Sequence, residues 1–346
     1  MGATEPGRPS LTWLHLVGGG VANLHLADQL ARVPKLPGTV VISEPKHAPL
    51  NGQTLCGFAR RGQIMAHRPS HRWNTWDFSH NGQKHKHQSS DWEYLRFAGA
   101  DVAQSVIQRL AAHPQIEWRR EALTQAPHAK WVLDGRPPPL SSFQAFQSFV
   151  GYEVSARAGE SLSLMEDIQA DSSGISFVYR LPLGDRTLIE LTRFENQPTD
   201  LSKLEQALQV HVAGRECLCR EAAVIPMGVR CDDHWGVPVG ARGGFARAST
   251  GYSFLASMQW AEHAAAALLQ GRVPRAPYSA LERWMDQVFL HVLRDRPDQL
   301  AQGLFQIARG LSGDRFAAFM AGGSWPAALQ MISAAPKLPF IQAALR

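Results

Sequence analysis

The chain has 346 residues, of which 45% are hydrophobic and 19% are charged, and it carries a formal net charge of +5. This composition excludes an intrinsically disordered protein and allows one large or two interwoven domains around a sizeable core. No nucleic-acid motif accompanies the scattered basic residues, no apolar run approaches the roughly 18 residues of a membrane span, and residues 1–10 lack a secretory signal. The four cysteines lack metal-ligand spacing, so we expect a reduced, cytoplasmic protein that binds no nucleic acid.

The first predicted elements are a strand, a helix and a second strand over residues 11–44. The strand W-L-H-L-V ends at three glycines that begin at Gly18, and an amphipathic stretch follows. Glycines here permit a tight turn, and they also let a pyrophosphate approach the N-terminus of the helix. Asn23 takes the third position of G-x-G-x-x-G, and Glu44 ends the second strand, 24 residues after Gly20. This is near the spacing of an acid that binds a ribose hydroxyl, so we predict a dinucleotide site, with a plain turn and a solvated Glu44 as the alternative.

Residues 45–92 form a polar stretch that is rich in His, Trp, Gln and Asn. His80, His85 and His87 could ligate zinc, but lysines interleave with them and no Cys or carboxylate stands at a firm spacing. We therefore predict a solvated loop and no metal site.

Helical spacing returns at about residues 100–112, and the apolar segment that follows reads as a buried strand ending at Asp134. The carboxyl ends of strands line the ligand crevice in a doubly wound sheet. We therefore predict that Asp134 and Arg136 contact the cofactor, with a simple Asp-Gly turn as the alternative.

Residues 143–200 change to the alternating pattern of antiparallel strands, with a hairpin turn at Gly184 and Asp185. Alternation places Glu190 on one strand face between apolar neighbours. A helix follows, and then a strand-like segment in which Glu221 precedes A-A-V-I-P. These two carboxylates are the candidates for proton transfer.

A second glycine-rich segment, residues 236–252, leads into a long helix that begins after Thr250 and Gly251. Two glycine-bearing helix starts so far apart predict a cofactor domain that is split in sequence. The remainder, residues 275–346, is helical and amphipathic.

Taken in order, these segments resemble the flavin-dependent lycopene cyclases of bacteria and plants. The resemblance is carried by G-G-G-V-A-N, D-G-R, Q-S-F-V-G-Y-E-V, F-V-Y-R-L-P-L, I-E-L-T, R-E-A-A-V-I-P and G-A-R-G-G-F-A-R-A-S-T-G-Y-S. It covers about residues 11–30 and 130–345, and the helical end resembles the bacterial members. Two segments depart from the family pattern: Q-T-L-C-G-F stands at 53–58 in place of H-T-W-S-F, and Arg220 precedes Glu221 where bacterial members often carry two glutamates.

The resemblance implies a mixed α/β fold: a glutathione-reductase-like Rossmann domain that binds FAD, an antiparallel-sheet substrate domain and a helical C-terminal region. The expected boundaries are 1–135 with 215–272 for the split FAD-binding domain, 136–214 for the substrate domain and 273–346 for the helical region. The residues implied to contact FAD are Gly18, Gly19, Gly20, Asn23, Glu44, Asp134, Arg136, Thr250, Gly251 and Tyr252.

The implied reaction is that of an isomerase, an acid-initiated ring closure at the ends of an acyclic carotenoid, assisted by reduced FAD with NAD(P)H as reductant. The expected substrate is a lipophilic polyene, and the expected product of the cyclisation carries β-rings. Glu221 is the first choice for the acid or base and Glu190 the second. Two other classes stay open: an FAD-dependent monooxygenase or halogenase, although the W-x-W-x-I-P motif is absent, and a non-catalytic polyene or quinone binder.

A polyene substrate lives in the bilayer, so we expect a cytoplasmic enzyme that binds peripherally to the inner face of the membrane. Residues 271–346 hold nine Arg and Lys against five Asp and Glu, which favours anionic lipid. The alternative is that the apolar residues of this region form an ordinary helical core. The apolar residues expected at the membrane are Phe316, Phe319, Met320, Trp325, Leu338 and Phe340.

Overall fold

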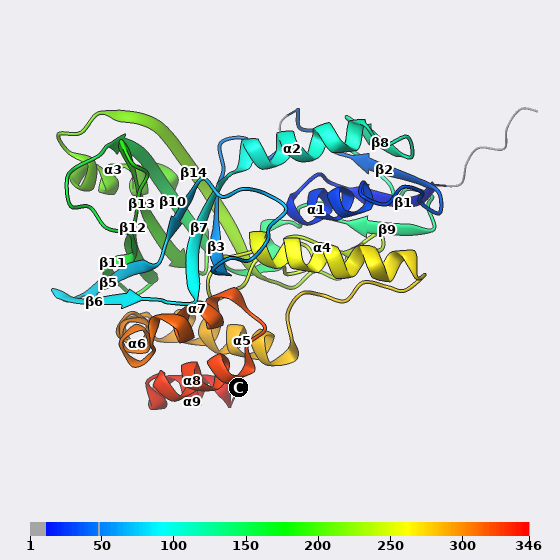
Figure 1. The fold of residues 1–346 in the computed structure, drawn as a ribbon. Helices are drawn as coiled ribbons and strands as arrows, with labels where there is room; N and C mark the ends of the chain where they lie inside the picture. The colour runs from blue at the N-terminus through cyan, green and yellow to red at the C-terminus, as the bar shows by residue number, and fades with distance from the viewer. Residues whose placement is uncertain (1–11, 48, 346) are drawn as a thin grey trace, which may run out of the picture.

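Three sheets and a group of C-terminal helices organise the part of the chain that the computed structural model describes, residues 12–47 and 49–345 (Figure 1). The expectation that residues 1–10 are not a secretory signal concerns a segment outside the described residues. Within the described residues, no helix is both long and apolar enough to cross a membrane.

The first sheet has five strands, and all of its neighbouring strands run parallel. In spatial order they are β15 (Val237–Pro238), β9 (Trp131–Asp134), β1 (Thr12–Val17), β2 (Thr39–Ser43) and β8 (Ile116–Arg119). Its helices are α1 (Val21–Leu30), α2 (Gly99–Ala111) and α4 (Phe254–Leu269), and α1 packs against the other two. The predicted βαβ unit is confirmed. Because β9, β1 and β2 are adjacent and parallel, their carboxyl ends meet at one edge of the sheet.

The second sheet has seven strands, and almost all of its pairings are antiparallel. Its order is β14 (Cys217–Val229), β10 (Phe143–Ser155), β13 (Arg186–Glu195), β12 (Gly174–Pro182), β11 (Ser163–Ala170), β5 (Thr75–His80) and β6 (Gln83–Gln88). A short 3-10 helix, Leu140–Ser142, leads into β10. The predicted hairpin is confirmed as β12 and β13, and its turn contains Gly184 at a φ of +88°.

Period-two alternation gives this sheet two different faces. Val150, Val178 and Ile189 are buried beneath α3 (Leu201–Val212). Residues of the other parity point to the opposite face, where α5 and α6 pack. Both candidate carboxylates lie on that second face.

The expectation of a solvated, irregular region over residues 45–92 was wrong, because four strands form within it and a fifth begins at Trp92. β3 (Thr54–Arg60), β7 (Trp92–Ala98) and β4 (His71–Trp73) make the third sheet, whereas β5 and β6 form a hairpin. That hairpin turns at Asn81 and Gly82, both with positive φ, which is a strong short-range hairpin signal. His87 is buried, and both of its ring nitrogens have hydrogen-bond partners. Trp76 Nε1 donates to its Nδ1 at 3.0 Å, and its Nε2 pairs with the carbonyl of Ala308 at 2.7 Å.

The strand pairing also departs from the expected domain boundaries. β5 and β6 fall within 1–135 and β14 falls within 215–272, yet all three belong to the seven-stranded sheet. The physical reason is long-range pairing: β14 runs antiparallel to β10, and β5 pairs with β11. No local sequence pattern encodes such partners.

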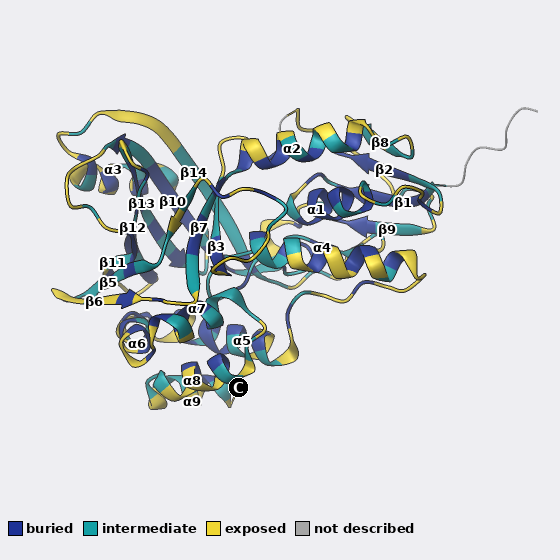
Figure 2. Ribbon diagram, in the orientation of Figure 1, coloured by how far each residue is buried: buried dark blue, intermediate teal, exposed yellow. Residues whose placement is uncertain are grey.

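The C-terminal region forms five helices that lie together beneath the seven-stranded sheet and β3 and β7 in Figure 1. They are α5 (Ala280–Asp295), α6 (Pro297–Gly310), α7 (Gly313–Ala321), α8 (Trp325–Ala334) and α9 (Lys337–Ala344). Phe316 and Phe319 on α7 are buried in the core, so their expected place at a membrane surface was wrong. Their side chains fill the space between α7 and the sheets. Exposed residues instead run along α8 and α9 (Figure 2).

Candidate active site

The turn after β1 is built from glycines for steric reasons. Gly18 has a φ of +88°, and a Cβ there would lie 3.0 Å from the carbonyl oxygen of Gly135. Gly20 caps α1 without any side-chain hydrogen bond, and nothing would lie within 4 Å of a Cβ at this position. The turn and the first residues of α1 line the cavity described below, and the N-terminus of a helix at a cavity wall is the usual position of a phosphate site.

Asn23 and Glu44 fasten this turn. Asn23 Nδ2 donates to the carbonyls of Val17 at 3.1 Å and Gly18 at 2.8 Å. The Glu44 carboxylate, directly after β2, accepts from the N–H of Gly19 at 2.6 Å. Both side chains also line the cavity described below. Asn23 stands where the G-x-G-x-x-G motif has its third glycine, and its two hydrogen bonds connect helix α1 to the turn.

The carboxyl end of β9 holds an ion pair. Asp134 accepts from Arg136 Nε at 2.9 Å and Nη2 at 2.7 Å, and from the N–H of Trp235 at 3.0 Å. Burial alone would raise the pKa of Asp134, but these hydrogen bonds outweigh it and the pKa is lowered. Arg136 lines the cavity, whereas the fully buried Asp134 does not. Asp134 therefore orients the side chain of Arg136 at the cavity wall.

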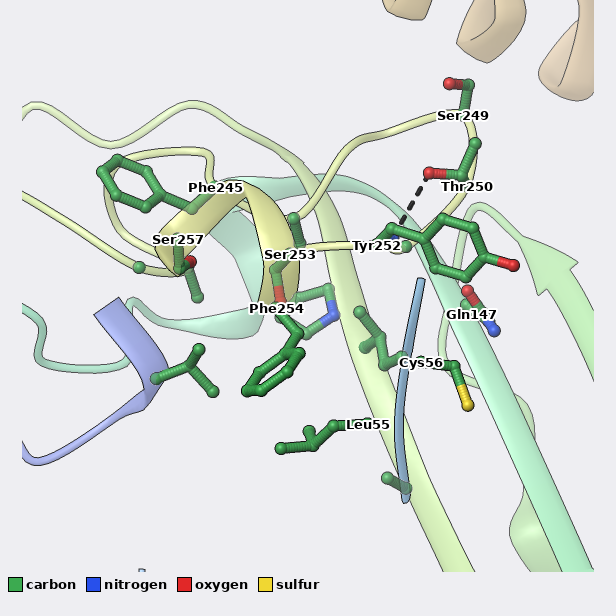
Figure 3. A pocket seen from close by; sticks show the side chains of 18 of the residues that line it. Leu55, Cys56, Gln147, Phe245, Ser249, Thr250, Tyr252, Ser253, Phe254 and Ser257 are labelled. Carbon is green, nitrogen blue, oxygen red and sulfur yellow. Dashed lines mark hydrogen bonds between the residues drawn. The ribbon is translucent and has the colours of Figure 1, made fainter. Parts of the chain in front are cut away.

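The second glycine-bearing segment precedes α4. Gly251 has a φ of +73°, and its N–H donates to the carbonyl of Arg247 at 2.7 Å. Thr250 Oγ1 accepts from the N–H of Tyr252 at 3.3 Å (Figure 3). Asp286 on α5 anchors the segment by accepting from Arg247 Nη2 at 3.0 Å. A C-terminal helix therefore holds this loop against the cavity.

One cavity of about 1170 Å³, here called the central cavity, connects all these parts. This volume exceeds the usual upper range for one small ligand, so it has room for two molecules. It begins at the glycine turn, passes the open face of the seven-stranded sheet and reaches α8 and α9. Most of its walls are apolar, including Phe149, Phe177, Ile225, Phe289, Met331 and Phe340.

Glu190 and Glu221 meet in this cavity on either side of Gly151. In the strand register, Gly151 pairs with Glu190 on β13 and with Glu221 on β14. Neighbouring strands lie about 4.8 Å apart, so the two Cα atoms are roughly 10 Å apart. Gly151 leaves no side chain between them. Sequence reasoning named both glutamates but could not show that they flank the same residue on one face of the sheet.

The environments of the two glutamates differ. Burial raises the pKa of Glu190 to about 8, and the charge of Glu221 adds to the rise. Among the described residues, the Glu190 carboxylate accepts one hydrogen bond, from Thr192 Oγ1 at 2.8 Å. Burial also raises the pKa of Glu221, but a hydrogen bond from the N–H of Thr54 at 2.8 Å opposes that rise by favouring the carboxylate. Glu190 is therefore held in its protonated form at neutral pH, whereas the contact with Thr54 favours the charged form of Glu221.

Three tyrosines and a thiol form a neutral polar cluster in the same wall, and of these the sequence analysis named only Tyr252, as an FAD contact. Tyr94 hydrogen-bonds Tyr179, and the hydroxyl of Tyr252 donates to that of Tyr94 at 3.1 Å. Burial raises the pKa of each tyrosine, and it raises that of Cys56 to about 12. These groups stay protonated at neutral pH, so the cavity holds no phenolate or thiolate.

Within residues 12–47 and 49–345, three lining residues carry buried polar atoms without hydrogen-bond partners: Asn23 Oδ1, Gln147 Oε1 and Ser257 Oγ. Gln147 and Ser257 were missed by the sequence analysis. Polar residues in apolar strand and helix patterns were the available signal. Buried polar groups are nearly always paired, so these atoms indicate a polar ligand. A metal site was considered for His80, His85 and His87. Among the described residues, no group of three or more His, Cys, Asp or Glu is arranged to hold a metal ion.

The fold and site define a class of mixed α/β proteins in which a Rossmann-type parallel sheet adjoins an antiparallel sheet across an apolar cavity. Solved structures with a similar fold include a geranylgeranyl bacteriochlorophyll reductase-like protein from Thermoplasma acidophilum (TM-score 0.61, 11% identity, covering 95% of this chain and 98% of that one). Others are the flavin-dependent brominase Bmp2 (TM-score 0.58, 12% identity, 93% and 97%) and a flavoprotein/dehydrogenase from Cytophaga hutchinsonii (0.55, 11%, 96% and 96%). At these identities the likeness shows the fold.

The chain belongs to the lycopene cyclase family, because the family model described as "Lycopene cyclase protein" matches residues 14–344. The family suspected from the sequence motifs is thereby confirmed. A comparison with curated protein sequences gives no significant match.

Proposed function

We propose that the protein is an FAD-dependent isomerase that closes a β-ring at the ends of an acyclic carotenoid such as lycopene, without net redox change. One observation carries this proposal: Glu190, an acid with a pKa of about 8, lies in an apolar cavity that continues to the glycine turn of a Rossmann-type sheet. Such a site keeps a carboxylic acid protonated at neutral pH and excludes water. Membership of the lycopene cyclase family supports the substrate class.

FAD fits the residues of the central cavity. The backbone of Gly18, Gly19 and Gly20 would hold its pyrophosphate, and Arg136 lies beside that turn. Asn23 Oδ1 and Ser257 Oγ, which are buried without a hydrogen-bond partner among the described residues, could each form a hydrogen bond with FAD. When bound and reduced, with NAD(P)H as reductant, the flavin would supply negative charge beside a developing cation.

The protein's own residues provide the proton chemistry. Glu190 adds its proton to a terminal double bond of the polyene, which leaves a tertiary cation. That cation closes the ring by taking the π electrons of a nearby double bond, and Glu221 removes a proton to restore a double bond. The dry aromatic walls keep water from trapping the cation. Return of the proton from Glu221 to Glu190 resets the pair.

This assignment reverses the order of the two glutamates that the sequence analysis preferred. The support is the hydrogen bond from Thr54, which stabilises a charged Glu221, and the absence of any backbone donor to Glu190 among the described contacts. A base is best held ionised and an acid best held neutral.

The proposal includes a peripheral location on the inner, cytoplasmic face of the membrane. The support is the far end of the central cavity, where Ile332 on α8 and Ile341 on α9 both line the cavity and are exposed. Trp325, Leu329 and Leu338 are exposed on the same two helices. An apolar rim around an apolar cavity suits a substrate that enters from lipid.

The deciding experiment is expression in cells that accumulate lycopene, followed by chromatographic separation of the pigments. A cyclised, non-oxygenated product with β-rings supports the proposal. An oxygenated product would instead favour the monooxygenase alternative, and unchanged lycopene that copurifies with the protein would favour the binding-protein alternative.

A further inference from the structure

Gln147 is a polar residue within the apolar row that β10 presents to the central cavity. It pairs with Phe194 on β13 and with Ile225 on β14. Phe149 and Gly151 follow it on the same face of the strand. Gly151, which lies between the two glutamates in the sheet, is four residues away, or roughly 13 Å along a strand. Gln147 is therefore in the cavity but remote from the proton-transfer pair.

The side-chain oxygen of Gln147 is buried and has no hydrogen-bond partner in the part of the chain that the structure describes. Gln144 on the same strand provides the contrast: its Nε2 donates to the carbonyl of Gly228 at 3.1 Å, and its Oε1 accepts from Arg230 at 2.5 Å. Leaving a buried amide oxygen unpaired costs stability. An unpaired amide in the cavity wall therefore indicates a ligand that completes it.

The unpaired oxygen lies against the loop that precedes α4. A Cβ at Gly251 would lie 2.2 Å from Gln147 Oε1, so only glycine permits this approach. The N–H of Gly251 is already used by the carbonyl of Arg247. Figure 3 shows the amide of Gln147 beside Tyr252, next to the glycine-bearing helix start. The loop approaches the amide without pairing with it.

The chemistry of the two ligands decides which of them the amide serves. A hydrocarbon polyene has no group that can donate to an amide oxygen. The pyrimidine edge of a flavin ring carries N–H and carbonyl groups that complement the acceptor and donors of a carboxamide. We propose that Gln147 is a positioning residue for the flavin, whose amide hydrogen-bonds the polar edge of the ring and sets how readily the flavin is reduced. This inference rests on the proposed function, because it assumes that the cavity binds FAD.

The test is to reconstitute purified protein with FAD and to measure both the FAD dissociation constant and the flavin midpoint potential. Gln147→Leu should weaken FAD binding roughly threefold to tenfold, the effect of one hydrogen bond, and should shift the midpoint potential. Gln144→Leu is the matched control on the same strand and should leave the potential and the dissociation constant unchanged. Thermal unfolding of each variant without FAD establishes that it folds.

A second variant keeps the shape of the side chain. Gln147→Glu places a carboxyl group at the same point, and its negative charge should lower the midpoint potential because reduction adds electrons to the ring. Wild-type potential and affinity in a folded Gln147→Leu or Gln147→Glu protein would overturn the assignment of Gln147. Failure of the wild-type protein to bind FAD would instead overturn the proposed function.

Discussion

Replacement of Glu190 by glutamine tests the proposed acid most directly. Glutamine preserves the size of the side chain and its acceptor for Thr192 Oγ1, but it has no proton to give. With a pKa of about 8, Glu190 is about 90% protonated at pH 7, whereas at the ordinary value of 4.5 the acid form would be about 0.3%. Burial therefore raises the population of the reactive form on the order of 300-fold.

The Glu190→Gln variant should lose cyclisation by at least about 100-fold, the lower range for removal of a general acid. It should also be more stable than the wild type. The folded pKa of Glu190 lies above its unfolded value, so the unfolded chain binds fewer protons between pH 4.5 and 8 and wild-type stability falls as the pH rises through this window. At pH 7 the raised pKa of Glu190 lowers the unfolding free energy of the wild type by an amount on the order of 3 kcal/mol, and the neutral glutamine side chain has no such effect.

Two assays check this pair of expectations. Pigments from a lycopene-producing host report cyclisation, and thermal unfolding of the purified proteins at pH 5 and pH 8 reports stability. The advantage of Glu190→Gln in unfolding temperature should grow from pH 5 to pH 8. Near-normal cyclisation by this variant would refute the role of Glu190 as the acid, and an advantage that does not depend on pH would refute its raised pKa.

The remaining predictions concern the base, the cofactor turn and the membrane. Glu221→Gln should reduce cyclisation less than Glu190→Gln and should leave FAD binding intact; loss of bound flavin would make Glu221 a structural residue instead. Gly18→Ala should weaken FAD binding in equilibrium dialysis, since its Cβ would press on Gly135, whereas Gly62→Ala has a similar φ of +76° but open space and should bind normally. Leu338→Ser, at a residue 70% exposed near the cavity end, should lower flotation with anionic vesicles roughly tenfold, and equal flotation would remove this surface from the proposal. Val210→Ser, at a residue 77% exposed on α3, is the control and should float as the wild type does.

Local sequence patterns were sufficient for the elements that depend on local physics. The glycine turn at Gly18, the βαβ unit and the hairpin at Gly184 each follow from backbone freedom and from side-chain periodicity. The order of several motifs identified the family, which the match over residues 14–344 confirms. The same local signal in Asn81 and Gly82 was overlooked, and the strands of residues 45–92 were missed with it.

Contacts between distant segments could be decided only by the tertiary structure. Glu190 and Glu221 are separated by α3 in the chain, and only the pairing of β10 with both neighbours places them on either side of Gly151. The same holds for Gln147 and its approach to Gly251. Sequence periodicity tells which face a residue takes, but it does not tell which strand or loop lies opposite.

The pKa of Glu190 also depends on contacts between segments that are distant in the sequence. The sequence determined that an acid stands at position 190 on an apolar strand face. The pKa of that acid depends on desolvation and on nearby charges, and both come from β14, the C-terminal helices and the cavity walls that close around it. The sequence alone therefore determined the family, the main elements and the candidate residues, whereas the packing of remote segments decided which glutamate is held neutral.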